Sequence, residues 1–266
     1  LDLNGVCIVV PGSRAGRRLL ELLVVDAEDR GLVFLPPRIK TVGDLPELLY
    51  QPKRPFADRL TQHLAWLHVV RDCDQVELRR FVRQIPDDGR NDEGDAAATD
   101  LDGWLRLARL LWRQHRELAG DGLSFQDVVD YGHVTRAFQD TARWQFLWRL
   151  QQAYLAQLDT CQLLDRQTAR LFAIEHGECH TDSDIILVAM SDVNRATRLM
   201  LDLVADRVTA LIAAPSALEP RFERYGCLIS AAWSDAPIEL DDAQIRLVDG
   251  SQGQVAAVAE IVADYG

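Results

Sequence analysis

Lysine is almost absent from this sequence. Of the 29 basic residues only Lys40 and Lys53 are lysines. A nucleotide-hydrolysing P-loop, G-x-x-x-x-G-K-[ST], uses its lysine to neutralise the β- and γ-phosphates. Neither lysine lies at a predicted turn from a strand through glycine into a helix. The sequence therefore argues against nucleotide hydrolysis, and we expect no cofactor.

Cysteines are few and scattered, and long apolar runs are missing. An odd set of cysteines without a C-x-x-C pair is not a disulfide scaffold, which favours a reducing cytoplasm. No apolar run approaches the roughly 20 residues that span a bilayer, and the N-terminus lacks the features of a signal peptide. The five cysteines are Cys7, Cys73, Cys161, Cys179 and Cys227.

Positive charge is also in short supply. The net charge of −12 excludes a surface that binds nucleic acid over its whole extent, so any such site must be local. The 266 residues, 48% of them hydrophobic, suffice for one large domain or for a domain with an insertion. The chain begins at Leu1 and ends just after a predicted strand and helix, so we expect it to be a piece of a longer polypeptide.

The apolar runs that are present predict an α/β fold with a mainly parallel sheet. Residues 5–10 form an unbroken apolar run, as in strands buried on both faces, and Ser13 is the expected N-cap of the following helix. A strand at 32–35 and a short helix after Thr41-x-x-Asp44 repeat this plan. Further strands are expected at 184–190 and 208–213, with a helix at about 195–205 between them.

The stretch from about 55 to 177 has helical patterning instead. Leu60, Leu64, Leu67 and Val70 fall on one predicted helix face. Ser124-x-x-Asp127 is a capping box, and Gly177 is expected to end the last helix. The sequence therefore predicts a large helical insertion in the sheet.

Two segments carry weaker signals. Residues 86–103 are acidic and aperiodic, which indicates a loop, and their glycines are out of register for an EF-hand. Residues 234–266 predict a linker, a strand and a helix. The expected domains are thus 1–54 with 178–233, the insertion 55–177, and a truncated second α/β domain from 234.

The first loop resembles a degenerate P-loop. Gly12, Ser13 and Gly16 follow the strand, but the glycine spacing is one residue short. Arg17 stands in place of the lysine, and Arg18 replaces the Mg²⁺ ligand, which arginine cannot be. A helix start bearing Arg14, Arg17 and Arg18 can still attract one phosphate. Arginines on a solvated helix face explain the pattern equally well.

Other candidate sites are weaker. Asp192 is the acid nearest the end of the third strand, where related enzymes carry a metal-binding acid, but a helix cap is the preferred interpretation. His176, Cys179 and His180 have zinc-ligand chemistry without a second ligand pair at suitable spacing, so we expect a surface turn and no metal. No G-x-S-x-G or H-E-x-x-H motif indicates a hydrolase.

Taken in order, four segments resemble the N-terminal part of the AddB/RexB family, the second subunit of bacterial helicase-nucleases. These are "VVPGSRAGRRLLELL", "VFLPPRIKTVGDLPELLY", "DIILVAMSDVNRATRLMLDLV" and "VTALIAAPSALEPRFERYGCL". The resemblance implies a RecA-like helicase domain with a helical insertion and the start of a second such domain.

The same resemblance implies a function. The chain would be a non-catalytic helicase-like region that acts in double-strand break repair and recombination and positions DNA and an AddA-like partner subunit. The full-length protein would be an exodeoxyribonuclease subunit. The alternative is an α/β protein-interaction scaffold with no role in nucleic-acid binding, which the −12 charge favours.

If the chain binds DNA, a few basic residues must make the phosphate contacts. The candidates are Arg14, Arg17 and Arg18 at the first helix start, together with Arg38 and Lys40 after the second predicted strand. Both groups are expected at the carboxyl ends of parallel strands, where α/β sheets bind ligands. With so few contacts, DNA binding by this fragment should be weak and sensitive to salt.

Overall fold

A computed structural model of the chain describes residues 1–82, 100–135, 138–234, 237, 241 and 244–264. The chain divides into two compact units, Leu1–Cys227 and Leu228–Gly266. The first unit holds a parallel sheet and a group of helices, and the second holds the helices α9 (Ser230–Trp233) and α10 (Gly250–Asp264). Within the described ranges, no helix has the length and apolar character needed to cross a membrane.

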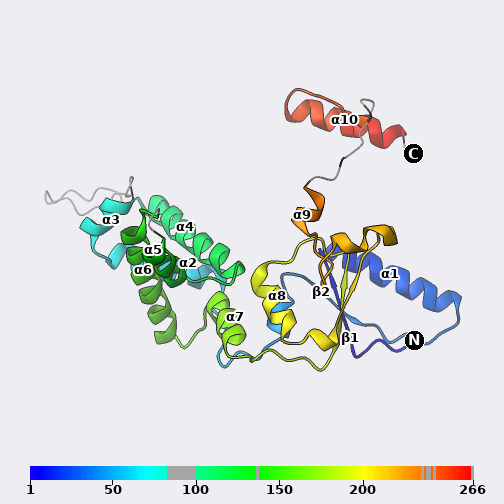
Figure 1. Ribbon diagram of the computed structural model, residues 1–266, viewed down its shortest axis with the longest axis horizontal. Coiled ribbons are helices and arrows are strands. Elements are labelled where there is room, and N and C mark those ends of the chain that lie inside the picture. Colours follow the sequence, from blue (N-terminus) through cyan, green and yellow to red (C-terminus); the bar gives the residue numbers. More distant parts are fainter. Residues whose placement is uncertain (83–99, 136–137, 235–236, 238–240, 242–243, 265–266) are drawn as a thin grey trace. The chain divides into compact units, whose positions relative to one another are not determined.

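The sheet has four strands in the order β2-β1-β3-β4, all parallel (Figure 1). They are β1 (Val6–Val10), β2 (Arg38–Thr41), β3 (Asp184–Val188) and β4 (Val208–Leu211). The apolar runs of β1 and β3 occupy the two central positions, where parallel strands are covered on both faces. This confirms an α/β fold built on one parallel sheet.

Helices lie on both faces of this sheet. The helices α1 (Ser13–Asp29) and α8 (Arg195–Asp202) lie on opposite sides (Figure 1). Gly16 is the point of closest approach for α1, because a Cβ there would lie 2.9 Å from Ile39 Cγ2 and 3.4 Å from Val10 Cγ2. Glycine at this position therefore lets the helix pack closely onto β1 and β2.

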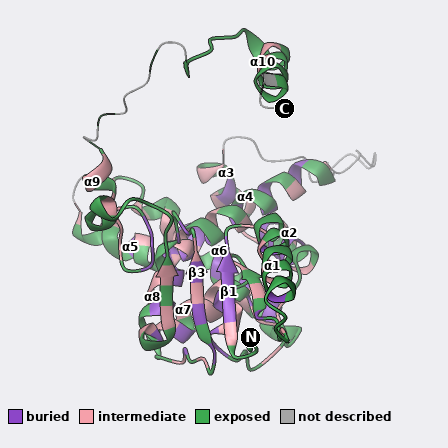
Figure 2. Cartoon of the chain, turned by 90° about the vertical axis from the view of Figure 1, so that its right-hand side faces the viewer, coloured by how far each residue is buried: buried purple, intermediate pink, exposed green. Residues whose placement is uncertain are grey.

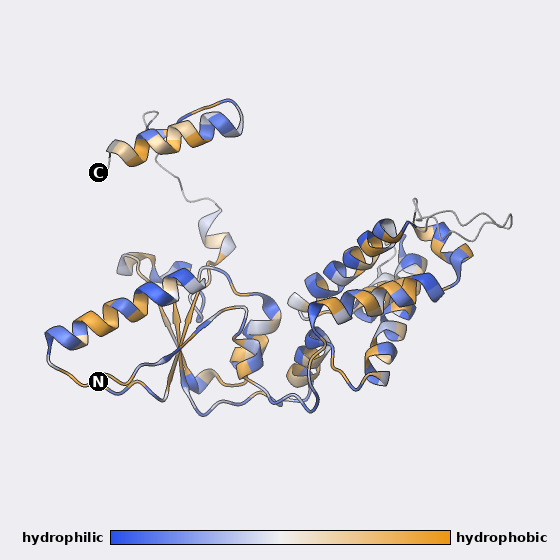
Figure 3. Ribbon diagram, turned by 180° about the vertical axis from the view of Figure 1, so that it is seen from behind, coloured by the Kyte–Doolittle hydropathy of each residue, from blue (hydrophilic) through white to orange (hydrophobic). Residues whose placement is uncertain are grey.

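The opposite face of the sheet carries its main hydrophobic core. Cys7, Val9, Ile185 and Leu187 are at most 2% exposed, and they pack against Met200 and Leu201 of α8 among others. In Figure 2 the central strands are largely buried, whereas α1 is mostly exposed. Figure 3 shows that hydrophobic residues nevertheless run along α1.

The second strand lies later in the chain than predicted. Residues 32–35 make only the isolated bridge Asp2↔Leu35, and the strand is β2, which follows the double proline. Its RIKT sequence alternates exposed and half-buried residues, as an edge strand does. The more apolar run before the prolines gave the stronger but misleading signal. After β2, Thr41 Oγ1 donates to Asp44 Oδ2 at 2.7 Å, and the expected helix is only the 3₁₀ turn η1 (Pro46–Leu48).

Six helices are described between β2 and β3. They are α2 (Arg59–Asp72), α3 (Gln75–Phe81), α4 (Leu101–Gly120), α5 (Phe125–Val134), α6 (Thr141–Thr160) and α7 (Arg166–Glu175). The capping box of Ser124 with Asp127 is confirmed, and Gly177, with φ 61°, follows the end of α7 as predicted. These helices share a second hydrophobic core around Trp66, Trp104 and Tyr154.

Several local predictions are wrong. Leu60 and Leu64 are 66% and 48% exposed, because α2 instead buries Trp66, whose ring stacks on Tyr154 at 4.4 Å. The N-cap of α1 is Gly12 rather than Ser13, and the N-cap of α8 is Asn194 rather than Asp192.

The remaining differences concern the two weaker segments. Residues 245–248 form no strand, although α10 follows as expected. Of the predicted loop at 86–103, residues 86–99 lie outside the described ranges, and 101–103 already belong to α4.

Candidate functional site

The carboxyl ends of β1 and β3 form the sheet's topological switch point. From β1 the chain leads through α1 to β2 on one side, while β3 and β4 lie on the other side. The helices α1 and α8 that follow β1 and β3 cover opposite faces (Figure 1). In open α/β sheets, ligands bind in the crevice outside such a point. The start of α1, which follows β1, lies at this point.

The turn between β1 and α1 contains only Pro11 and Gly12. Ser13 already begins the helix, and the N–H of Gly16 donates to the carbonyl of Gly12 at 3.2 Å. The first turn of any helix leaves N–H groups without helical acceptors, and these suit one anion. The loop thus offers a helix start rather than a wrapped cradle of backbone N–H groups.

The three arginines of α1 are exposed but differ in their partners. Arg18 makes an ion pair with Glu21 at 3.1 Å. Arg14 and Arg17 make no ion pair with any described residue. Both lie near the start of a helix whose first turn contains no acid. Their charges are therefore free to meet an external anion.

Arg38 and Lys40 do not join the arginines of α1. Ile39 faces α1 at Gly16, so its neighbours in the strand point to the opposite face of the sheet. Arg38 begins β2 and donates to Ser183 Oγ just before β3, at the amino ends of the strands. The expected place at the carboxyl edge is therefore wrong for Arg38, because it relied on a strand at 32–35. Lys40 pairs with Val9, near the carboxyl end of β1, but on the face away from α1.

The predicted zinc ligands have separate partners. The His176 ring stacks on Phe172 with centroids 3.9 Å apart, while His180 Nδ1 lies 3.2 Å from the carbonyl of Glu178. Cys179 is buried, which raises the pKa of its thiol to about 11. Among described residues, no group of three or more His, Cys, Asp or Glu side chains is arranged to hold a metal.

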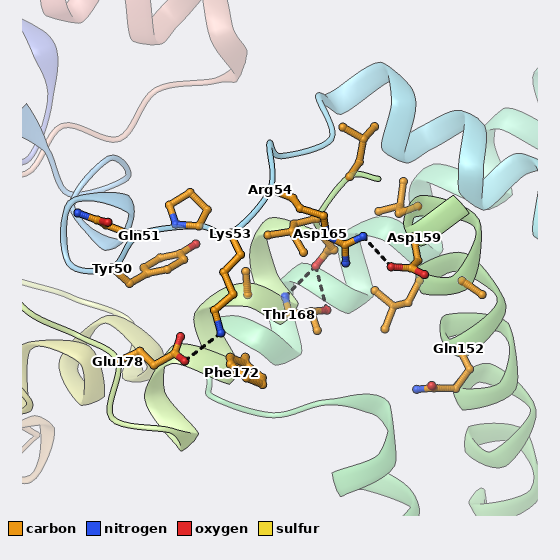
Figure 4. A pocket seen from close by; sticks show the side chains of 17 residues that line it. Tyr50, Gln51, Lys53, Arg54, Gln152, Asp159, Asp165, Thr168, Phe172 and Glu178 are labelled. Carbon is orange, nitrogen blue, oxygen red and sulfur yellow. Dashed lines mark hydrogen bonds and ion pairs between the residues drawn. The ribbon is translucent and has the colours of Figure 1, made fainter. Parts of the chain in front are cut away.

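A cavity of about 550 Å³ lies where the segment after η1 passes the ends of α6 and α7 (Figure 4). Its walls include Leu155, Leu163 and Phe172. At its rim, Lys53 Nζ lies 3.4 Å from Glu178 Oε1, and Arg54 Nη1 lies 2.7 Å from Asp159 Oδ1. The charges at the rim are therefore balanced, and the interior is mainly apolar.

Tyr50 and Asp165 are the buried polar residues in the lining of this cavity. The Tyr50 hydroxyl is buried and has no hydrogen-bond partner among described residues, and burial raises its pKa, so it stays protonated. The Asp165 carboxylate accepts bonds from the backbone N–H and hydroxyl of Thr168, from Tyr154 and from His115. It is not a free base. The cavity thus has the features of a binding pocket, in which the buried Tyr50 hydroxyl is available as a hydrogen-bond donor.

A group of arginines outside the predicted site surrounds the start of α2 and one face of α4. We call Arg59, Arg109, Arg116 and Arg166 the arginine cluster; all four are exposed. Arg59 Cζ and Arg116 Cζ lie 5.4 and 4.5 Å from the Trp112 ring centroid. The sequence signal for this surface is the pattern R-x-x-W-R-x-x-R at 109–116, which the candidate DNA contacts predicted from the sequence do not include.

Comparison with known proteins provides no assignment: no protein-family model and no curated protein matches the chain.

Proposed function

We propose that this chain is the RecA-like, non-catalytic helicase region of a helicase-nuclease subunit that acts in double-strand break repair and recombination. In this proposal α2 to α7 are the helical insertion, and residues from 234 begin a second α/β domain. The chain positions DNA and an AddA-like partner subunit in the cytoplasm. Strand cleavage would belong to other parts of the full-length protein.

One observation carries the proposal: unpaired arginines lie at the helix start beside the switch point. A nucleotide hydrolase would need a lysine and a metal-binding hydroxyl there. This chain has Arg17 and Arg18, and the Arg14 and Arg17 side chains are exposed without ion-pair partners among described residues. The place that binds nucleotide phosphates in an active motor is thus suited to a backbone phosphate of DNA.

DNA titrations at two salt concentrations test this proposal. Labelled single- and double-stranded DNA are titrated at about 50 and about 200 mM salt, where phosphate contacts differ greatly in strength. The variants are Arg14→Ala with Arg17→Ala, and separately Arg38→Ala with Lys40→Ala. The control, Arg106→Ala with Arg149→Ala, removes the same charge from exposed pairs with Asp102 and Glu77.

We expect the unaltered chain to bind DNA with a dissociation constant of roughly 10⁻⁴ to 10⁻⁶ M, and binding should weaken as salt rises. Each of the two test variants should bind more weakly, and its salt slope on duplex DNA should be smaller by about 0.9 per lost contact. The control variant should bind like the unaltered chain. Because the two pairs lie on different faces, their effects should add. Equal binding by all variants would show that the residues are wrongly assigned.

Absence of nucleotide binding is a second expectation. Calorimetry with Mg²⁺-ATP should give no heat of binding, because Arg17 and Arg18 replace the lysine and the metal-binding hydroxyl. Micromolar affinity that is lost on Arg17→Ala would contradict this.

The scaffold alternative is favoured by the apolar surface of α1. Leu22 and Val25 are 50% and 53% exposed on this helix. Such residues are typical of helices that another protein covers. If the chain binds no DNA at low salt, the scaffold function replaces the one proposed.

A further inference from the structure

The arginine cluster is a local concentration of positive charge in an acidic chain. No member of the cluster, Arg59, Arg109, Arg116 or Arg166, makes an ion pair with a described residue. Elsewhere, nine described arginines do so, among them Arg54 with Asp159 and Arg207 with Asp184. The cluster therefore brings four arginines without ion-pair partners together on one surface.

The four arginines influence one another through shared neighbours. Burial lowers the pKa of Arg116, and the charges of Arg170, Arg59 and Arg166 lower it further. Burial also lowers the pKa of His63, with added repulsion from Arg59 and Arg109. Such repulsion opposes folding, so local stability gives no reason for gathering these charges.

Few acids compensate the cluster. Glu117 acts on Arg116 in the opposite direction, and Asp58 caps α2 by accepting from the backbone N–H of Thr61. Glu47 is already committed, because Arg170 donates to both of its carboxylate oxygens at 2.6 and 2.8 Å. A net positive surface remains.

Aromatic rings lie directly among these charges. Trp112 is half-buried and lies within 5.4 Å of two guanidinium groups, and Arg166 Cζ lies 5.4 Å from the Phe56 ring centroid. The Trp112 indole donates to Gln62 Oε1 at 2.6 Å, and Gln62 donates to the carbonyl of Ala57. These bonds hold the ring in place before any ligand arrives.

We propose that the arginine cluster, with Trp112 and Phe56, is a second binding surface that takes single-stranded DNA. Guanidinium groups pair with backbone phosphates, and the half-buried rings of Trp112 and Phe56, with the guanidinium planes beside them, offer unpaired bases a surface for stacking. Bases within a duplex are already stacked and cannot use these rings. The inference extends the proposed function to another face of the chain and uses none of the residues at the start of α1.

The test uses the whole chain and a labelled oligothymidylate. The variant Arg59→Ala, Arg116→Ala, Arg166→Ala is compared with the control Arg106→Ala, Arg149→Ala, Arg207→Ala, which removes the same charge from exposed ion pairs. Circular dichroism verifies that both variants fold. Anisotropy is measured over a salt series, and duplex DNA and an RNA strand of matched length serve as competitors.

We expect the cluster variant to bind oligothymidylate at least tenfold more weakly, with a salt slope smaller by about 2, since three contacts at about 0.7 each are lost. The control should bind like the unaltered chain. Equal loss in cluster and control variants would overturn the proposal, because it would show a general charge effect. Stronger competition by duplex than by single strands, or by RNA than by DNA, would also contradict it.

A parallel measurement separates this inference from the proposed function. If Arg14→Ala with Arg17→Ala weakens DNA binding while the cluster variant does not, the second surface is refuted and the proposed function stands. If only the cluster variant weakens binding, the second surface stands and the residues assigned at the switch point are wrong. Tryptophan fluorescence gives a second readout. We expect single-stranded DNA to quench the fluorescence of Trp112 in the unaltered chain, and Trp112→Phe should reduce this quench.

Discussion

Asp165 connects three helices through a single buried carboxylate. It caps α7, accepts from His115 Nε2 of α4 at 2.9 Å, and accepts from the Tyr154 hydroxyl of α6 at 2.8 Å. Gln151 bonds the other nitrogen of His115. Every member of this group is at least 96% buried, so the group stabilises the helices and cannot take part in surface chemistry.

This arrangement predicts a loss of stability in acid. Burial alone would raise the pKa of Asp165, but His115 and the hydrogen bonds from Thr168 and Tyr154 lower it from 3.8 to about 2. A carboxylate with a lowered folded pKa stabilises the protein above its unfolded pKa. That contribution, on the order of 2 kcal/mol, should disappear as the pH falls from about 4 to about 2.

Asp165→Asn should lower the free energy of unfolding at neutral pH by about 2 kcal/mol, because a charged acceptor is lost from a buried group. Asp58→Asn is the matched control, since Asp58 caps α2 in the same way but is exposed, and asparagine caps helices equally well. Urea unfolding at several pH values measures both. Identical acid sensitivity in Asp165→Asn and the unaltered chain would contradict the explanation.

Ala189 has a left-handed backbone at the end of β3, with φ 53°. A side chain in this region costs about 1 kcal/mol or more, and glycine avoids that cost. Because Ala189 is exposed, Ala189→Gly loses no core contact and should stabilise the chain by up to about 1 kcal/mol. Ala196→Gly inside α8 should have the opposite effect, and thermal unfolding of both variants distinguishes them.

Residue-scale prediction succeeded where a signal is local. The capping box at Ser124 needs only the spacing to Asp127, and Gly177 needs only the end of a helix. The partners of Asp165 come from α4 and α6, at 50 and 11 residues' distance, and no local pattern announces them. The same separation hid the arginine cluster, which combines α2, α4 and α7.

At the scale of elements, α1 is charged against its own dipole. The positive end of a helix dipole lies at its N-terminus, where cations are unfavourable. Arg14 lies in the first turn of α1, which contains no acidic residue, and Arg18 lies one turn further along the helix. An arrangement that opposes helix stability is consistent with a requirement for positive charge at this place.

Arg14→Glu should therefore stabilise the chain and weaken DNA binding at the same time. The substitution replaces an unfavourable interaction with the helix dipole by a favourable one and allows a new ion pair with Arg18. Together these changes should raise the free energy of unfolding by about 1 kcal/mol. Arg30→Glu, at the other end of α1, removes a pair with Asp26 and should destabilise it. If Arg14→Glu lowers the melting temperature, the charge at this helix start has a structural role that we have not identified.

Strands were predictable where their sequences are apolar, which includes the edge strand β4, expected at 208–213 and found at Val208–Leu211. The central strands β1 and β3 have continuous apolar sequences, and both were placed to within a few residues. The edge strand β2 is written RIKT and was missed in favour of an apolar run that makes one bridge. Its displacement also moved Arg38 from the expected carboxyl edge to the amino edge.

At the scale of the whole chain, the first unit has two hydrophobic cores, one on the sheet and one among the helices. The segment after η1 joins them and carries Tyr50, Lys53 and Arg54 along the cavity. One proposed DNA-binding surface lies at the sheet, and the arginine cluster lies on the helices that surround the second core. The proposed function therefore requires a chain with a net charge of −12 to bind DNA through local concentrations of positive charge.

The salt dependence of DNA binding by the unaltered chain tests this account most directly. Affinity for a labelled single strand is measured from about 50 to about 200 mM salt, and the logarithms of affinity and salt concentration are compared. Seven contacts, from Arg14, Arg17, Arg38, Lys40, Arg59, Arg116 and Arg166, predict a slope of about −4.9. No binding at the lowest salt, or binding that does not change with salt, would contradict a role in holding DNA.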